Sequence, residues 1–176
     1  ADKLTAKTLR MNPPEMIVSI KTGRLDAAFL PEHYATLAES LGFRMALLSK
    51  EIWPDYPGSV LVVTEKLFKE QPALVRKLVA VSRRATEWIN RHPDEAAAIV
   101  TAELNGAGVR IFPTEISPLA TGLKLNKDIV RRSMDRLDYT CDLDPETVQG
   151  VIDFMVELNY IPTGVTSDDL ILDLKK

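Results

Sequence analysis

Apolar residues along the chain form two kinds of pattern, short continuous runs and longer stretches of helical spacing. The continuous runs are bounded by turn residues, which is typical of buried parallel strands. The stretches between them place apolar residues three and four positions apart, which predicts helices. Strands that alternate with helices imply a parallel sheet with right-handed crossovers, so we expect an α/β fold. The expected strands are 4–11, 26–30, 43–48 and 60–63.

Helix starts and stops follow from capping residues. Asn12 and Pro13 suit the start of one helix, and Asp144 and Pro145 suit the start of another. The most regular pattern, at 73–90, has apolar residues at three- and four-residue steps over its whole length. The helix after Asn12 is expected to bury Met16, Ile17 and Ile20 and to end at Gly23, and the helix after Asp144 to cover 145–158. Thr64 can cap a turn that starts at Glu65. Further helices are expected at 34–41, 94–104, 114–122, 126–136 and 167–174, with the run Asn105-Gly106-Ala107-Gly108 ending the one at 94–104.

The segment 50–58 separates two parts of the chain. Its sequence Trp53-Pro54-Asp55-Tyr56-Pro57-Gly58 holds two prolines and a glycine, which neither a helix nor a strand interior favours. We therefore expect a linker or hinge here.

Composition excludes several classes of protein. The 176 residues are 45% hydrophobic and 27% charged, which is typical of a globular chain. A net charge of -3, without a basic run interleaved with aromatics, argues against nucleic-acid binding. Cys141 is the one cysteine, so no intrachain disulfide forms. No apolar run approaches the length of a membrane span, and 1–10 lacks the order of a signal peptide.

No motif predicts a metal, a cofactor or a catalytic group. His33 and His92 lie far apart in sequence, without the neighbouring ligands of a zinc site. No nucleophile elbow, P-loop or dinucleotide-binding glycine motif occurs. Cys141 is expected to be an inert, buried residue, and Asp144 to be a helix cap rather than a calcium or acid-base group. The pairs Arg83-Arg84 and Arg131-Arg132 are expected on solvated helix faces.

The segment Pro31-Glu32-His33-Tyr34 is the strongest candidate for a binding site. It follows an expected strand, and ligands of open parallel sheets bind beyond the carboxyl ends of the strands. A carboxylate, an imidazole and a phenol meet there at the start of a helix, whose N–H groups favour an anion. The structural alternative is that Pro31 ends a strand and Glu32 complements the helix dipole.

Six segments in order along the chain form a recognisable combination. They are IKTGRLDAAFLPEH at 20–33, IWPDYP at 52–57, VLVV at 60–63, QPALV at 71–75, WIN at 88–90 and HPDEAA at 92–97. Together they resemble the substrate-binding proteins of nitrate/sulfonate/taurine-type ABC importers. The resemblance covers nearly the whole chain, and the combination of segments is more specific than any one of them. In place of the usual Glu-Pro after the strand, this chain has Pro31-Glu32-His33.

The resemblance implies a type II periplasmic-binding fold whose two lobes close on a small polar or anionic ligand and dock on a membrane permease. It places 1–56 in the carboxyl-terminal part of lobe two and 57–176 in the returning part of lobe one, so the chain would be part of a longer protein. It implies a periplasmic or otherwise extracytoplasmic location, with a lipoprotein anchor as one form. The ligand residues would be Glu32, His33 and Tyr34 as polar anchors, with Trp53, Tyr56, Gly58 and Ser59 at the hinge.

Two other functions stay open at this stage. One is an enzyme, because relatives of the implied fold include a thiamine-pyrimidine synthase, although the cysteine-rich segment of that branch is absent and no nucleophile-base pair or Schiff-base lysine stands out. A non-catalytic helical interaction module is the other alternative, and the expected strands argue against it. Strands such as 60–63, apolar on both faces, would also expose unpaired edges, so self-association is expected.

Overall fold

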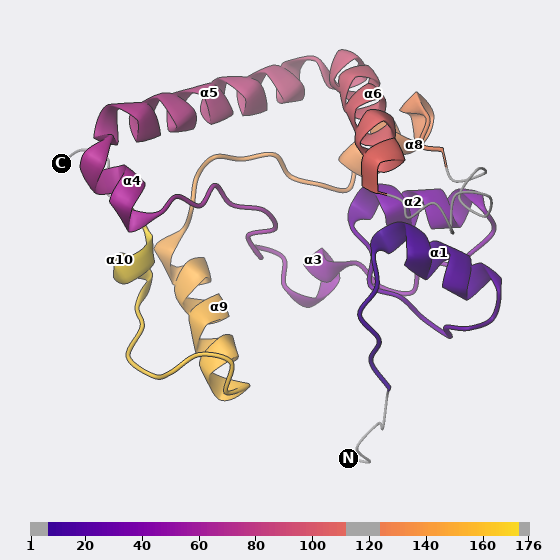
Figure 1. The fold of residues 1–176 in the computed structure, drawn as a ribbon, viewed down its shortest axis with the longest axis horizontal. Helices are drawn as coiled ribbons and strands as arrows, with labels where there is room; N and C mark the ends of the chain where they lie inside the picture. Colours follow the sequence, from indigo (N-terminus) through magenta and orange to yellow (C-terminus); the bar gives the residue numbers. More distant parts are fainter. Residues whose placement is uncertain (1–6, 112–123, 173–176) are drawn as a thin grey trace. The chain divides into compact units, whose positions relative to one another are not determined.

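The computed structural model describes residues 7–111 and 124–172, and across them the chain forms helices joined by irregular segments (Figure 1). No strand occurs among these residues. The expected α/β fold with parallel-sheet lobes of the periplasmic-binding type is therefore wrong for the described chain. Three of the four expected strands, and the described part of the fourth, are irregular stretches between helices.

The exposure of the apolar runs explains this error. Phe29 is 98% exposed and Val62 is 78% exposed, so neither side chain has the cover that a buried strand needs. The preference of β-branched and aromatic residues for strands reflects packing on neighbouring strands rather than a property of the single segment. A short apolar run also carries too few residues for its periodicity to identify it.

The described residues form two compact units, each built from two stretches of sequence. One unit comprises the chain up to Met45 together with His92–Asp138. The other comprises Ala46–Arg91 and the chain from Tyr139 onward. These units follow spatial contacts and do not test the division into lobes at 56/57, which stays a prediction.

Within its described residues, the first unit contains four helices that pack on one another. The helix α8 contacts both α2 and α6, and α2 also contacts α1 (Figure 1). Their shared core is apolar apart from buried Thr36, Ser19 and Ser133. The helices are α1 (Pro13–Lys21), α2 (Glu32–Ser40), α6 (Pro93–Ile111) and α8 (Lys127–Met134). The buried apolar residues are Ile17, Leu37, Ala38, Ala96, Ala97, Leu125, Ile129, Val130 and Met134.

The second unit has much less buried apolar surface. Val75 and Ile152 are the buried apolar residues found in its described part. The helix α4 contacts α5, and α9 contacts α10. The helices are α3 (Ser49–Ile52), α4 (Glu65–Glu70), α5 (Pro72–Arg91), α9 (Pro145–Glu157) and α10 (Ser167–Leu170).

Capping residues in the sequence correctly predicted several helix starts. Thr64 accepts a hydrogen bond from Leu67 N at 3.1 Å, and Asp144 accepts one from Thr147 N at 3.0 Å. Gly42 has a φ of +94°, a left-handed conformation that suits glycine after a helix end. The expected break at 105–108 is wrong, because α6 continues to Ile111. The expected helix at 114–122 lies outside the described residues.

Candidate ligand-binding site

Glu32, His33 and Tyr34 form the first turn of α2. Pro31 precedes them with an extended backbone, and its carbonyl accepts hydrogen bonds from Tyr34 N at 2.9 Å and Ala35 N at 3.0 Å. Because proline lacks an N–H and fixes φ, it suits this boundary between an irregular segment and a helix. The alternative that Pro31 ends a strand is wrong, because 26–30 is irregular and Pro31 is instead the residue that precedes α2.

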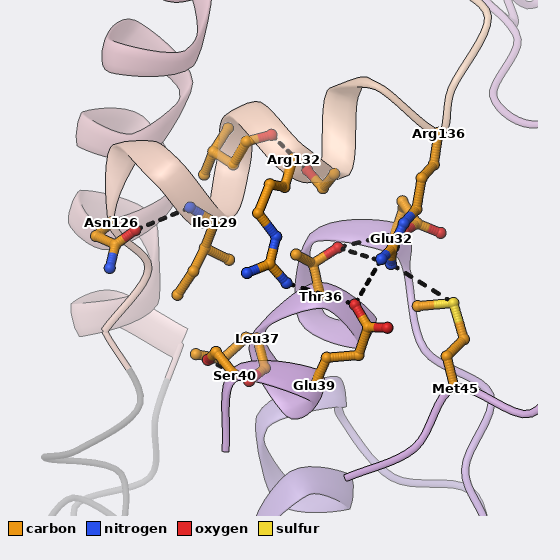
Figure 2. A network of polar contacts seen from close by, with 12 residues as sticks. Glu32, Thr36, Leu37, Glu39, Ser40, Met45, Asn126, Ile129, Arg132 and Arg136 are labelled. Carbon is orange, nitrogen blue, oxygen red and sulfur yellow. Dashed lines mark hydrogen bonds and ion pairs between the residues drawn. The ribbon is translucent and has the colours of Figure 1, made fainter. Parts of the chain in front are cut away.

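The Glu32 carboxylate is held by Arg136, which follows the end of α8 (Figure 2). Arg136 Nη1 lies 3.1 Å from Glu32 Oε1, and Thr36 Oγ1 donates to the same oxygen at 3.2 Å. Arg136 Nη2 donates to Glu39 Oε2 at 2.6 Å, and Arg132 Nη2 lies 3.5 Å from that oxygen. We call Glu32, Thr36, Glu39, Arg132 and Arg136 the Arg136 network.

The Arg136 network joins α2 to α8 and the residues that follow it, and several of its side chains are partly buried. The Glu32 side chain is only 15% exposed, and the side chains of Arg136 and Glu39 are each 26% exposed. The hydrogen bond to Glu39, reinforced by Glu32, raises the pKa of Arg136 above its ordinary value despite some desolvation. The guanidinium therefore stays charged, and two arginines balance two carboxylates. Glu32 is accordingly a structural ion-pair partner as well as a candidate ligand group.

His33 and Tyr34 form an aromatic pair beside this network. Their ring centroids lie 4.5 Å apart with the planes at 45°. Desolvation lowers the pKa of His33, while the Glu32 charge opposes that effect, and burial raises the pKa of Tyr34. At neutral pH the imidazole is therefore mainly uncharged and the phenol keeps its proton, so both rings offer a hydrogen-bond donor to a ligand.

The hinge candidates Trp53, Tyr56, Gly58 and Ser59 belong to the second unit. The Trp53 ring lies 5.5 Å from the Tyr56 ring and 6.3 Å from the Phe154 ring, with Phe154 edge-on at 90°. A Cβ added at Gly150 would lie only 3.1 Å from Trp53 Cζ2. Trp53 thus packs on α9, whereas Tyr56, Gly58 and Ser59 are exposed along the segment that leads to α4.

The seven predicted site residues thus fall into two groups in different units. The first group, Glu32, His33 and Tyr34, is contiguous in α2, and the second group clusters only through the rings of Trp53 and Tyr56.

Sequence reasoning missed the partners of Glu32. Thr36 and Glu39 follow Glu32 at four and seven positions, which places all three on one face of a helix. Arg132 and Arg136 share a face in the same way, with the opposite charge. The sequence signal that could have predicted these contacts was two rows of opposite charge, one on each segment. The expected solvated pair Arg131-Arg132 is instead engaged, because Arg131 pairs with Asp94 at 3.3 Å and also with Asp135, while Arg132 contacts Glu39.

Within the described residues, no group of three or more histidine, cysteine, aspartate or glutamate side chains is arranged to hold a metal ion. Cys141 Sγ donates to Thr86 Oγ1 at 3.2 Å and is half-buried. Among the helices of the part that the structure describes, none is long and apolar enough to cross a membrane.

Comparison with known proteins identifies the class. The sequence model of the NMT1-like family matches residues 3–104, which is more than half of the chain. The chain therefore belongs to the NMT1-like family, a family of nitrate/sulfonate/taurine-type ABC substrate-binding proteins. All seven predicted site residues fall within the matched range, whereas Arg132 and Arg136 fall outside it. No curated protein and no solved structure matches the chain.

Proposed function

We propose that this chain is a solute-binding component of an ABC importer, capturing a small polar or anionic ligand and delivering it to a membrane permease. The observation that supports the proposal is the family match over residues 3–104, because the NMT1-like family is a binding-protein family. Proteins of this family are typically extracytoplasmic, so we propose a periplasmic or other extracytoplasmic location. The proposed role is binding without catalysis and without a cofactor.

The proposed polar anchors are the side chains at the start of α2. His33 and Tyr34 would donate hydrogen bonds from an uncharged imidazole and a phenol, which suits an anionic or polar solute. The charge of Glu32 would repel an anion if it stood alone, but Arg136 at 3.1 Å offsets it. Glu32 would therefore accept a hydrogen bond from a donor group on the ligand without making the site strongly acidic.

The proposed apolar walls are Trp53 and Tyr56, with Gly58 and Ser59 offering backbone and hydroxyl groups. Their support is the ring cluster at Trp53 and the exposure of the following segment. They belong to the second unit and are proposed as an independent set of ligand contacts.

A thermal-shift screen of the protein against nitrate, taurine, other small sulfonates, bicarbonate and pyrimidines tests the proposal. Binding to the native state raises the midpoint of unfolding, because it stabilises that state by RT ln(1 + [L]/Kd). We expect at least one of these solutes to raise the midpoint by an amount that grows with its concentration in this way. If none does so at millimolar concentration, the proposed function is wrong.

Tyr34→Phe then tests the site. Loss of one phenol donor should weaken binding of the identified solute by about 0.5–1.5 kcal/mol, because a neutral hydrogen bond contributes that much. Tyr160→Phe is the matched control, since Tyr160 is 74% exposed and lies outside both groups of site residues. Equal affinities of the two variants, measured by calorimetry, would remove Tyr34 from the site while leaving the function standing.

One alternative gains support from the structure. The strands that argued against a helical interaction module are absent from the described residues, whose regular elements are all helices. The catalytic alternative gains no comparable support.

A further inference from the structure

The apolar face of α5 is only partly covered by the rest of the chain. One row along the helix, which is buried or half-buried, comprises Val75, Val79, Ser82, Thr86 and Ile89. The adjacent row is exposed, with Leu74 at 41%, Leu78 at 38% and Val81 at 61%, and it continues at Ala85. We call Leu74, Leu78, Val81 and Ala85 the α5 stripe. Its steps of four and three residues are those of a coiled-coil seam.

A basic row borders the α5 stripe along its outer flank. Lys77, Arg84 and Arg91 recur every seven residues, so they share one line on the helix surface, and all three are exposed. Arg91 makes an exposed ion pair with Glu87 at 3.1 Å, a contact that solvent already weakens. An occupant of the α5 stripe should therefore carry an apolar row flanked by acidic residues.

The helix α9 of the same chain has such a face. Phe154 is 51% exposed and Leu158, the residue that caps its end, is 44% exposed. Beside them lie Glu146, Asp153 and Glu157, all exposed and on one flank of the helix. Asp153 accepts a hydrogen bond from Gln149 Nε2 at 2.8 Å, which leaves its negative charge in place.

The two flanks match in an antiparallel arrangement. In α5, Lys77 and Arg84 each come one residue before a residue of the stripe, Leu78 and Ala85, and in α9 Asp153 precedes Phe154 in the same way. Both charged rows therefore lie on the same side of their apolar rows. Antiparallel packing brings equivalent flanks together, so the basic row of α5 meets the acidic row of α9. Two copies of α5 in that arrangement would instead bring basic rows together and repel.

We propose that α5 of one copy of this chain binds α9 of a second copy, antiparallel, through the α5 stripe and the Phe154–Leu158 face. Among the described helices, α5 contacts α4 and α9 contacts α10, so these two faces do not cover each other within one chain. In a two-fold dimer, α5 of each copy contacts α9 of the other copy, so both faces are covered in both copies. This interface belongs to the second unit, where Phe154, 51% exposed, also contacts the Trp53 ring.

Sedimentation velocity of the 176-residue chain over a concentration series tests the proposal. The wild type should show a monomer–dimer equilibrium. The double variant Lys77→Glu/Arg84→Glu places acid against acid and should weaken the dimer at least about tenfold, because like charges across an interface are costly. Asp153→Lys/Glu157→Lys should do the same by placing base against base. Mixing the two double variants should give a heterodimer, and joining all four changes in one chain should restore the homodimer.

Lys66→Glu/Arg76→Glu is the matched control, because it changes the charge equally at exposed positions away from the stripe. It should dimerise as the wild type does, and circular dichroism checks that every variant keeps its helices. The proposal is overturned if the wild type is monomeric up to about 100 μM, a concentration at which even weak specific dimers form. It is equally overturned if the control weakens the dimer as much as the stripe variants, or if the four changes together fail to restore it.

Discussion

Arg136 follows the end of a helix, yet its ion pairs connect two helices of the first unit. Its guanidinium contacts two part-buried carboxylates, Glu32 at 3.1 Å and Glu39 at 2.6 Å. Arg136→Met keeps the length of the side chain and removes the charge, leaving both carboxylates without their main partner. We expect this change to lower the free energy of unfolding by about 1–3 kcal/mol, less than for a fully buried pair because solvent still reaches the site.

Urea unfolding measures this change, and Arg83→Met provides the control. Arg83 makes an exposed ion pair with Asp142 at 3.6 Å, and such pairs contribute at most about 0.5–1 kcal/mol. Equal destabilisation by the two variants would show that the Arg136 network contributes no more than an ordinary surface pair.

His33 gives the stability a dependence on pH. Its pKa in the folded protein lies below the ordinary value near 6.5. Between the two pKa values the unfolded chain binds more protons than the folded one, so stability is fully present above about pH 6.5 and falls as the pH drops through that window. His33→Gln should reduce this acid-dependent loss, as followed by thermal unfolding between pH 7 and pH 5. His92→Gln should leave the contribution of His33 in place, and an identical profile for all three proteins would contradict the assignment.

Sequence could predict Glu32, His33 and Tyr34 as neighbours, because they are consecutive residues at the start of a helix. It could not predict that Glu32 meets Arg136, since the two are separated by 104 positions and meet only through the packing of α2 on α8. Their role in ligand binding stays a prediction. The rows of charged residues on the two helices could be recognised from their spacing in the sequence, but which rows face each other depends on the tertiary fold.

At the scale of elements, capping chemistry was the most reliable guide. The regular pattern at 73–90 and the Asp144-Pro145 start correspond closely to α5 and α9, because both signals are local. Strands were predicted wrongly because a strand depends on neighbours that the apolar run itself does not specify. The glycines at 106 and 108 did not end α6, because a glycine in a helix costs only about 1 kcal/mol relative to alanine and the rest of the helix offsets that.

Alanine substitutions at two helical glycines are expected to have different effects on the free energy of unfolding. Gly106→Ala should raise the free energy of unfolding by about 0.5–1 kcal/mol, because the new methyl group meets no atom within 4 Å and the helix gains propensity. Gly150→Ala should gain less or lose stability, because its Cβ would lie 3.1 Å from the Trp53 ring. Chemical unfolding measures both changes, and Trp53 fluorescence should respond only to the second. A larger gain at Gly150 than at Gly106 would contradict the packing of Trp53 on α9.

Asn126 tests the start of α8. Its side chain accepts a hydrogen bond from Ile129 N at 2.8 Å. Asn126→Ala should destabilise the protein by about 1 kcal/mol, and Asn126→Asp should retain most of the stability because aspartate caps equally well. If the two variants unfold alike, the cap does not contribute to stability.

At the scale of the whole molecule, buried apolar residues are unevenly distributed. Most of them lie in the first unit, where α8 packs on α2 and α6, whereas the second unit buries Val75 and Ile152 in its described part. Regions with few buried apolar contacts open at lower free energy. We therefore expect amide hydrogen exchange to be slower in α2 and α8 than in α4 and α10. Uniform exchange across these helices would show that the two units unfold together.

The chain belongs to the NMT1-like family over residues 3–104, and solute binding is the central function that we propose from it. Isothermal titration calorimetry of the protein with the solutes selected by thermal shift tests this most directly. We expect saturable binding of a small polar or anionic solute at one site per chain, weakened by Tyr34→Phe and unchanged by Tyr160→Phe. The absence of measurable heat with every member of the nitrate, sulfonate, bicarbonate and pyrimidine panel, by a protein with a cooperative unfolding transition, would contradict it.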